Sequence, residues 1–140
     1  MAIYDGLVFK TRLEAQWAAF FDLAGWEWRM NPAPVGDWAP DFRVTFPCGH
    51  SECGPTHTLL VSVVPTANKA DLPLHPVSKR RYTVEGYSAA DAGAVFGSNP
   101  DATSWEFSHG AGGGVFDVPF FEGNASALWE RAGKLVNIEK

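Results

Sequence analysis

The chain has no hydrophobic run of membrane-spanning length and no basic segment leading into an apolar stretch near its start. A transmembrane helix needs about 20 consecutive apolar residues, and a secretory signal needs a basic region before its apolar one. We therefore expect a soluble, intracellular protein. Cysteine is also scarce, with two in 140 residues. Because nothing else indicates export, a disulfide framework is not expected.

Positive charge is in short supply as well. Eleven Lys and Arg residues against sixteen Asp and Glu residues give a net charge of −5. A dedicated nucleic-acid-binding protein is usually basic, because much of its affinity comes from neutralising phosphates. The dense basic cluster at Lys79, Arg80 and Arg81 is more typical of a solvated loop or strand edge than of a phosphate contact. The balance of charge favours a protein partner, with a nucleic acid as the alternative.

Apolar residues are abundant: 46% of the chain is hydrophobic and 14% is aromatic. That composition is too apolar for a disordered chain and sufficient for a packed core. With no internal repeat and no linker, residues 1–140 are expected to form one domain. Of the six tryptophans, Trp38 and Trp105 are the two that we expect at the surface.

The strongest local pattern predicts a helix over residues 12–23. Thr11 and Glu14 have the spacing of a capping box, and Gly25 supplies a left-handed stop. Apolar residues between them recur on one helical face: Leu13, Trp17, Phe20, Phe21 and Ala24. A second helix is predicted over residues 125–136.

Several short runs predict β-strands, at residues 26–30, 42–46, 58–64, 103–107 and 115–120. The run 58–64 lacks alternation and is rich in β-branched residues, as in a central strand covered on both faces. Ser88 and the residues up to 96 have the pattern of a short helix, which Gly93 weakens. The element order predicts an α/β fold, with a small mixed β-sheet flanked by an N-terminal and a C-terminal helix.

Three segments carry a resemblance to a known superfamily. They are residues 9–22 (FKTRLEAQWAAFFD), 40–42 (PDF) and 128–136 (LWERAGKLV). Their helix–strand order resembles the PD-(D/E)XK nuclease superfamily, and in detail a small group of phage and bacterial proteins within it. The resemblance implies a restriction-endonuclease-like core in which Glu14 and Asp41 are the metal-binding carboxylates.

In such relatives the central strand carries Glu-x-Lys, with the glutamate on the metal and the lysine near the attacking water. Aligning residues 60–65 with that strand puts Ser62 at the glutamate position and Val64 at the lysine position. Valine cannot orient or deprotonate water, and a neutral hydroxyl is a poor ligand for Mg²⁺. We therefore expect Glu14 and Asp41 to be vestigial. A capping box also explains Glu14, and the end of a loop or strand also explains Asp41.

The resemblance, the small size and the acidic charge together imply a phage or prophage protein that acts by binding in the host cytoplasm. It would block a host defence complex by occupying a protein surface, or form part of a particle. The alternative is a Mg²⁺-dependent endonuclease with relocated active-site residues. In that case Lys69 would replace the missing lysine and Asp37 would lend a carboxylate.

A second motif lies in the loop at residues 48–57, between two predicted strands. Cys48, His50, Cys53 and His57 have the spacing C-x-H-x₂-C-x₃-H. Four such ligands suit tetrahedral Zn²⁺, and a filled ligand set would make the zinc structural. The zinc would fix the conformation of the hairpin that positions Asp41. The spacing is not a common zinc-finger pattern, so an ordinary hairpin loop with solvent-facing histidines and buried thiols is the alternative.

Overall fold

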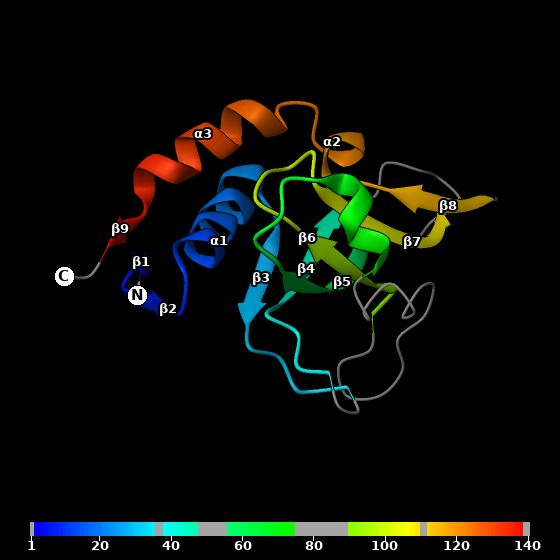
Figure 1. Cartoon of the computed structure of the whole chain (residues 1–140), viewed down its shortest axis with the longest axis horizontal. Coiled ribbons are helices and arrows are strands. Elements are labelled where there is room, and N and C mark those ends of the chain that lie inside the picture. Colours follow the sequence, from blue (N-terminus) through cyan, green and yellow to red (C-terminus); the bar gives the residue numbers. More distant parts are fainter. Residues whose placement is uncertain (1, 36–37, 48–55, 75–89, 110–111, 139–140) are drawn as a thin grey trace.

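The chain folds into an α/β structure, seen in a computed structural model that describes residues 2–35, 38–47, 56–74, 90–109 and 112–138 (Figure 1). Its elements in chain order are β1 (Ala2–Tyr4), β2 (Leu7–Phe9), α1 (Arg12–Ala24), β3 (Glu27–Met30), β4 (Phe42–Pro47), β5 (Thr56–Val63), the 3₁₀-helix η1 (Lys69–Leu74), β6 (Ala92–Phe96), β7 (Thr103–His109), β8 (Gly112–Phe116), α2 (Val118–Phe121), α3 (Ala125–Leu135) and β9 (Asn137–Ile138).

The main sheet has six strands in the order β3-β4-β5-β6-β7-β8. The pair β5–β6 is parallel and the other neighbours are antiparallel, so the sheet is mixed. As predicted, β5 lies inside the sheet. The predicted fold class, a mixed sheet with an N-terminal and a C-terminal helix, is confirmed.

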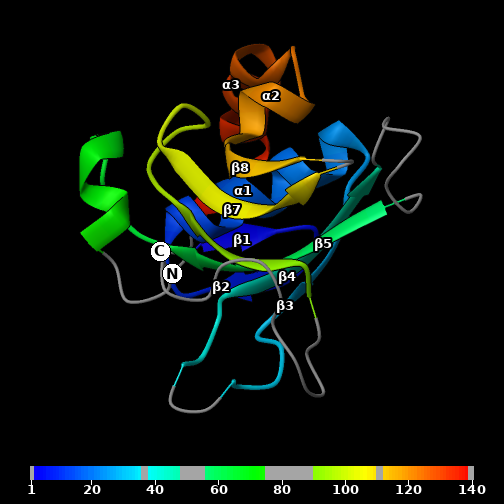
Figure 2. The same cartoon turned by 90° about the vertical axis from the view of Figure 1, so that its right-hand side faces the viewer.

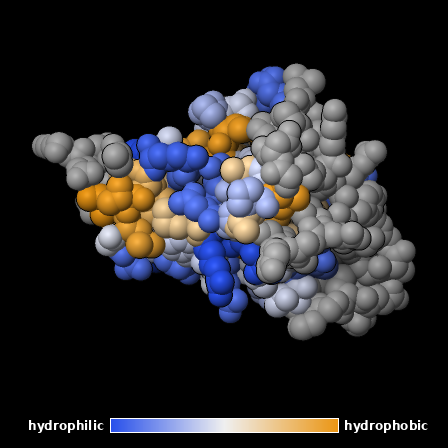
Figure 3. All heavy atoms as spheres, turned by 90° about the horizontal axis from the view of Figure 1, so that it is seen from below, coloured by the Kyte–Doolittle hydropathy of each residue, from blue (hydrophilic) through white to orange (hydrophobic). Residues whose placement is uncertain are grey.

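A second, smaller sheet has the order β2-β1-β9 and joins the two ends of the described chain. In Figure 1 it lies at the end of the molecule where both termini are marked. Figure 3, seen from below, shows hydrophobic surface at this same end. The exposed apolar side chains of β2 are Leu7 and Val8.

Helix α1 begins and ends where its capping residues predict. The Thr11 hydroxyl accepts a hydrogen bond from the Glu14 N–H at 3.1 Å. Gly25 has a φ of 77° and its N–H donates to the Asp22 carbonyl at 3.1 Å. This left-handed conformation is one that glycine adopts at little cost.

The buried face of α1 forms the centre of an aromatic core. Trp17 is fully buried, and its ring centroid lies 4.4 Å from that of Trp129 in α3 and 4.7 Å from that of Phe96 in β6. Burying each such side chain stabilises the fold by roughly 1.5–3 kcal/mol. The Arg12 and Gln16 side chains also donate to backbone carbonyls of α3, which fixes α1 against α3.

Helix η1 covers the opposite face of the main sheet. Its Leu72 packs with Val95 and Val64, whereas the neighbouring residue Phe96 belongs to the core on the α1 side. Successive side chains of a strand point to opposite faces. Figure 2 shows η1 set apart from α2 and α3, which lie together.

Two secondary-structure predictions are wrong. The short helix expected up to residue 96 is strand β6, whose five residues are all buried between β5 and β7; ladder partners on both sides outweigh a weak helical pattern. The strand expected over 115–120 ends at Phe116. The Asp117 carboxylate then accepts from the Phe120 N–H at 3.2 Å and caps α2.

Of the two tryptophans expected at the surface, one lies in the core and the other is partly covered. Trp105 is 3% exposed and belongs to the core, so its expectation is wrong. Trp38 is half-buried. Within the described ranges no helix is long and apolar enough to cross a membrane.

Gly97 follows β6 at a point where no side chain fits. A Cβ there would lie 2.3 Å from the Thr66 carbonyl oxygen and 2.8 Å from that of Ala102. We predict that Gly97→Ala lowers the free energy of unfolding by about 1–3 kcal/mol, measured by urea denaturation. Gly123→Ala is the matched control, because a Cβ at Gly123 meets nothing within 4 Å. Equal effects of the two substitutions would contradict the close packing at Gly97.

Candidate functional site

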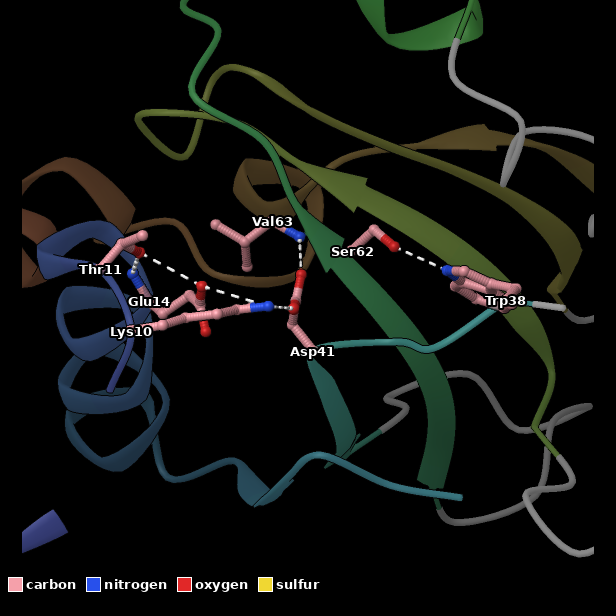
Figure 4. Close-up of polar contacts among 7 residues, drawn as sticks. All are labelled: Lys10, Thr11, Glu14, Trp38, Asp41, Ser62 and Val63. Carbon is pink, nitrogen blue, oxygen red and sulfur yellow. Dashed lines mark hydrogen bonds and ion pairs between the residues drawn. The ribbon is translucent and has the colours of Figure 1, made fainter. Parts of the chain in front are cut away.

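Three charged side chains meet where α1 begins and β5 ends (Figure 4). Lys10 precedes α1, Glu14 lies in its first turn, and Asp41 directly precedes β4. The Lys10 Nζ lies 2.9 Å from Asp41 Oδ1 and 3.8 Å from Glu14 Oε1. These three residues are called the Lys10 cluster below.

Both carboxylates are held by backbone and hydroxyl groups. Asp41 donates its N–H to the Val61 carbonyl, and its Oδ2 accepts from the Val63 N–H at 2.8 Å. The carboxylate thus closes the end of β5. Glu14 Oε1 accepts from the Thr11 hydroxyl at 3.3 Å. Asp41 therefore has the strand-end role that the sequence offered as its other explanation, whereas the Glu14 carboxylate contacts the Thr11 hydroxyl.

The two charged partners of Asp41 have shifted pKa values. The hydrogen bond from Lys10 to Asp41 raises the pKa of the ammonium above 10.5, against the opposing effect of burial. Lys10 is therefore charged at neutral pH. Burial first, and then the charge of Asp41, raise the pKa of Glu14, whereas Lys10 lowers it. The Glu14 side chain is only 9% exposed, while that of Lys10 is 67% exposed.

Strand β5 brings the predicted Glu-x-Lys positions to the wrong face. The Ser62 hydroxyl accepts from Trp38 Nε1 at 2.8 Å, and Val64 packs with Leu72 of η1. Both residues therefore belong to the face away from α1. The β5 residues on the α1 side that lie beside Asp41 are Val61 and Val63, which pack into the main core. None of the residues from 61 to 64 is therefore a carboxylate or a lysine, whichever face it lies on.

Lys10 is the residue that the sequence reasoning missed. The sequence instead points to the central strand or to Lys69, which begins η1, for the lysine; Asp37 lies outside the described residues. The available signal was the four-residue spacing from Lys10 to Glu14, which places two side chains on neighbouring turns at a helix start. The contact with Asp41 spans 31 residues and has no local signal.

The Lys10 cluster supplies two carboxylates, those of Glu14 and Asp41, towards a set of Mg²⁺ ligands. Mg²⁺ requires near-octahedral coordination by oxygen ligands. Both Asp41 oxygens already accept hydrogen bonds, one from Lys10 and one from Val63. In the described part of the chain no three His, Cys, Asp or Glu side chains gather as a metal site would require. The ammonium of Lys10 itself supplies positive charge to the two carboxylates.

Only one member of the Cys/His motif falls within the described residues. Cys48, His50 and Cys53 lie outside them, as does the basic cluster at 79–81. His57 is buried in β5, its Nδ1 lies 3.6 Å from Asp91 Oδ2, and its ring packs near Phe121. The alternative of a solvent-facing histidine is therefore wrong for His57. The structural zinc stays a prediction.

Comparisons with known proteins add no relative to this picture. No family model, no curated protein and no solved structure matches the chain. The resemblance to the PD-(D/E)XK superfamily therefore rests on the sequence segments alone.

Replacing Lys10 should change how Glu14 titrates. We predict that Lys10→Met raises the pKa of Glu14 further, because the Lys10 charge that lowers it is lost. The pKa of Glu14 in the folded protein lies above its unfolded value of about 4.5. The free energy of unfolding therefore falls as pH rises from the unfolded to the folded pKa of this group. That fall should be larger in the variant. Carboxyl NMR titration measures the pKa, and urea denaturation at each pH measures the stability.

The control for this titration is Lys134→Met, because Lys134 lies on the exposed side of α3. It removes the same charge from the chain without touching the cluster. An unchanged Glu14 pKa in Lys10→Met would show that the ion pair is absent in solution.

Zinc binding by the Cys/His motif can be measured on purified protein. We predict one zinc per chain by elemental analysis, reduced in a Cys48→Ser/Cys53→Ser variant. Chelation should lower the melting temperature, because a structural zinc stabilises only the folded chain. A metal-free protein whose melting is unaffected by chelator would exclude the motif as a zinc site.

Proposed function

We propose that this protein acts by binding a protein partner and does not hydrolyse nucleic acid at the Lys10 cluster. One observation carries the proposal: Lys10 lies 2.9 Å from Asp41 and 3.8 Å from Glu14. A resident ammonium thereby provides the charge that a divalent cation provides in a hydrolytic site.

The chemistry of the neighbouring strand supports the same proposal. Hydrolysis at a metal site needs enough oxygen ligands to hold the ion and a group that activates water. Val61 and Val63 are the β5 residues that pack into the α1-side core beside Asp41, and neither side chain can ligate or accept a proton. Asp41 is engaged at both oxygens. The cluster is thus suited to fixing α1 to the end of β5.

The nature of the partner is inferred from charge and from the resemblance. A net charge of −5 favours a protein surface with basic groups over a nucleic acid. The resemblance to a phage and bacterial group indicates where the protein acts. We infer that it binds a host complex, such as a defence complex, in the host cytoplasm, or takes part in a particle.

A second candidate function is a Mg²⁺-dependent endonuclease in which Lys10 is the relocated lysine. The same geometry favours it, because two carboxylates and a lysine converge from separate elements (Figure 4). Lys10 would then orient a water molecule or phosphate oxygen, since its side chain is 67% exposed. This candidate makes the opposite prediction for nucleic-acid cleavage.

A cleavage assay separates the two candidates. Supercoiled plasmid and single-stranded nucleic acid are incubated with the protein in Mg²⁺ or Mn²⁺. We predict no cleavage above the background of a mock preparation. Cleavage that requires metal, disappears in Asp41→Ala and persists in Asp101→Ala would overturn the binding proposal. Asp101 is a suitable control because it is exposed and lies outside the cluster.

A further inference from the structure

Strand β2 is an open edge of the small sheet. Within the described part of the chain it pairs only with β1. Two of its three side chains are apolar and exposed, Leu7 at 41% and Val8 at 48%. Figure 3 shows hydrophobic surface at this end of the molecule.

Within its three residues this edge carries no charged residue, proline or bulge. Natural edge strands use these features, or a very short length, to prevent pairing with another chain. The sequence of β2 is Leu-Val-Phe, and its register with β1 is regular over all three residues. An unprotected apolar edge is a template for strand addition.

The turn before β2 determines which backbone groups face outward. Asp5 and Gly6 have φ values of 51° and 76° and form a two-residue connection between Tyr4 and Leu7. The pair that closes such a hairpin exchanges hydrogen bonds, and hydrogen-bonding direction alternates along the strand. The N–H and C=O groups of Val8 therefore point away from β1.

The charges at the two ends of β2 indicate what covers the edge. Asp5 is exposed and has no ion pair within the described ranges. Lys10, at the other end, is 67% exposed and has three N–H donors. An antiparallel copy of β2 that places Val8 opposite its own equivalent sets Lys10 opposite Gly6, beside Asp5. Opposite charges thus meet at both ends of the pair.

We propose that β2 is a self-association edge, at which two copies of the chain pair antiparallel about a twofold axis. The pairing joins two small sheets into one continuous sheet and covers Leu7 and Val8 of both copies. A twofold axis makes each favourable contact occur twice. The charge complementarity selects a second copy over an unrelated strand.

The interface is small, so the association is weak and reversible. Each copy contributes one short strand and two exposed apolar side chains, which is below the size of a stable dimer interface. The association does not depend on whether the Lys10 cluster cleaves nucleic acid. Failure in the cleavage assay and failure to self-associate are therefore separate results.

Sedimentation velocity of the full chain over a wide concentration range tests the proposal. The wild-type protein should shift reversibly from monomer to dimer as concentration rises. Val8→Lys should weaken the dimer by about tenfold or more, because two lysines would face each other across the axis. Val115→Lys is the matched control, since Val115 is 66% exposed on β8, an edge strand of the main sheet.

Asp5→Asn provides a second variant that keeps the turn, because asparagine tolerates a positive φ. It should weaken the dimer and reduce its salt dependence, as expected when an ion pair is lost. A wild-type protein that stays monomeric at every concentration would overturn the proposal. So would a dimer that Val115→Lys disrupts and Val8→Lys leaves intact.

Discussion

The structure depends on the packing of α1 against the main sheet. Trp17, Phe20 and Phe21 are completely buried, and their rings contact β6, β4 and α3. Because this face is fixed, the beginning of α1 has one position relative to the end of β5. That position brings Lys10 and Glu14 to Asp41. The charged cluster is therefore a consequence of the aromatic core.

The Lys10 cluster holds two carboxylates beside one lysine ammonium. Two acidic side chains held close together repel each other, and the raised pKa of Glu14 reflects both that repulsion and its burial. A divalent cation or an ammonium can each relieve the repulsion. With Lys10 in contact, the cluster connects α1 to β5 through charge and hydrogen bonds.

The two sheets differ in how their edges are placed. The main sheet buries its centre under α1 on one face and under η1 on the other. The small sheet pairs the chain's first strand with its last and leaves β2 at its edge. The apolar, regular character of that short strand distinguishes it from β3, whose exposed residues are Glu27 and Arg29. Charge protects β3 as an edge and is absent from β2.

The sequence by itself determined α1 and the strands 42–46 and 58–64, because Thr11, Gly25 and the apolar spacing act within a few residues. It also identified Glu14 and Asp41 as candidate site residues. Tertiary structure decided that residues 92–96 form a strand, since their partners lie in β5 and β7. It also decided that Ser62 and Val64 face away from α1, and that Lys10 reaches Asp41. These outcomes depend on contacts between residues far apart in the chain, which no local pattern records.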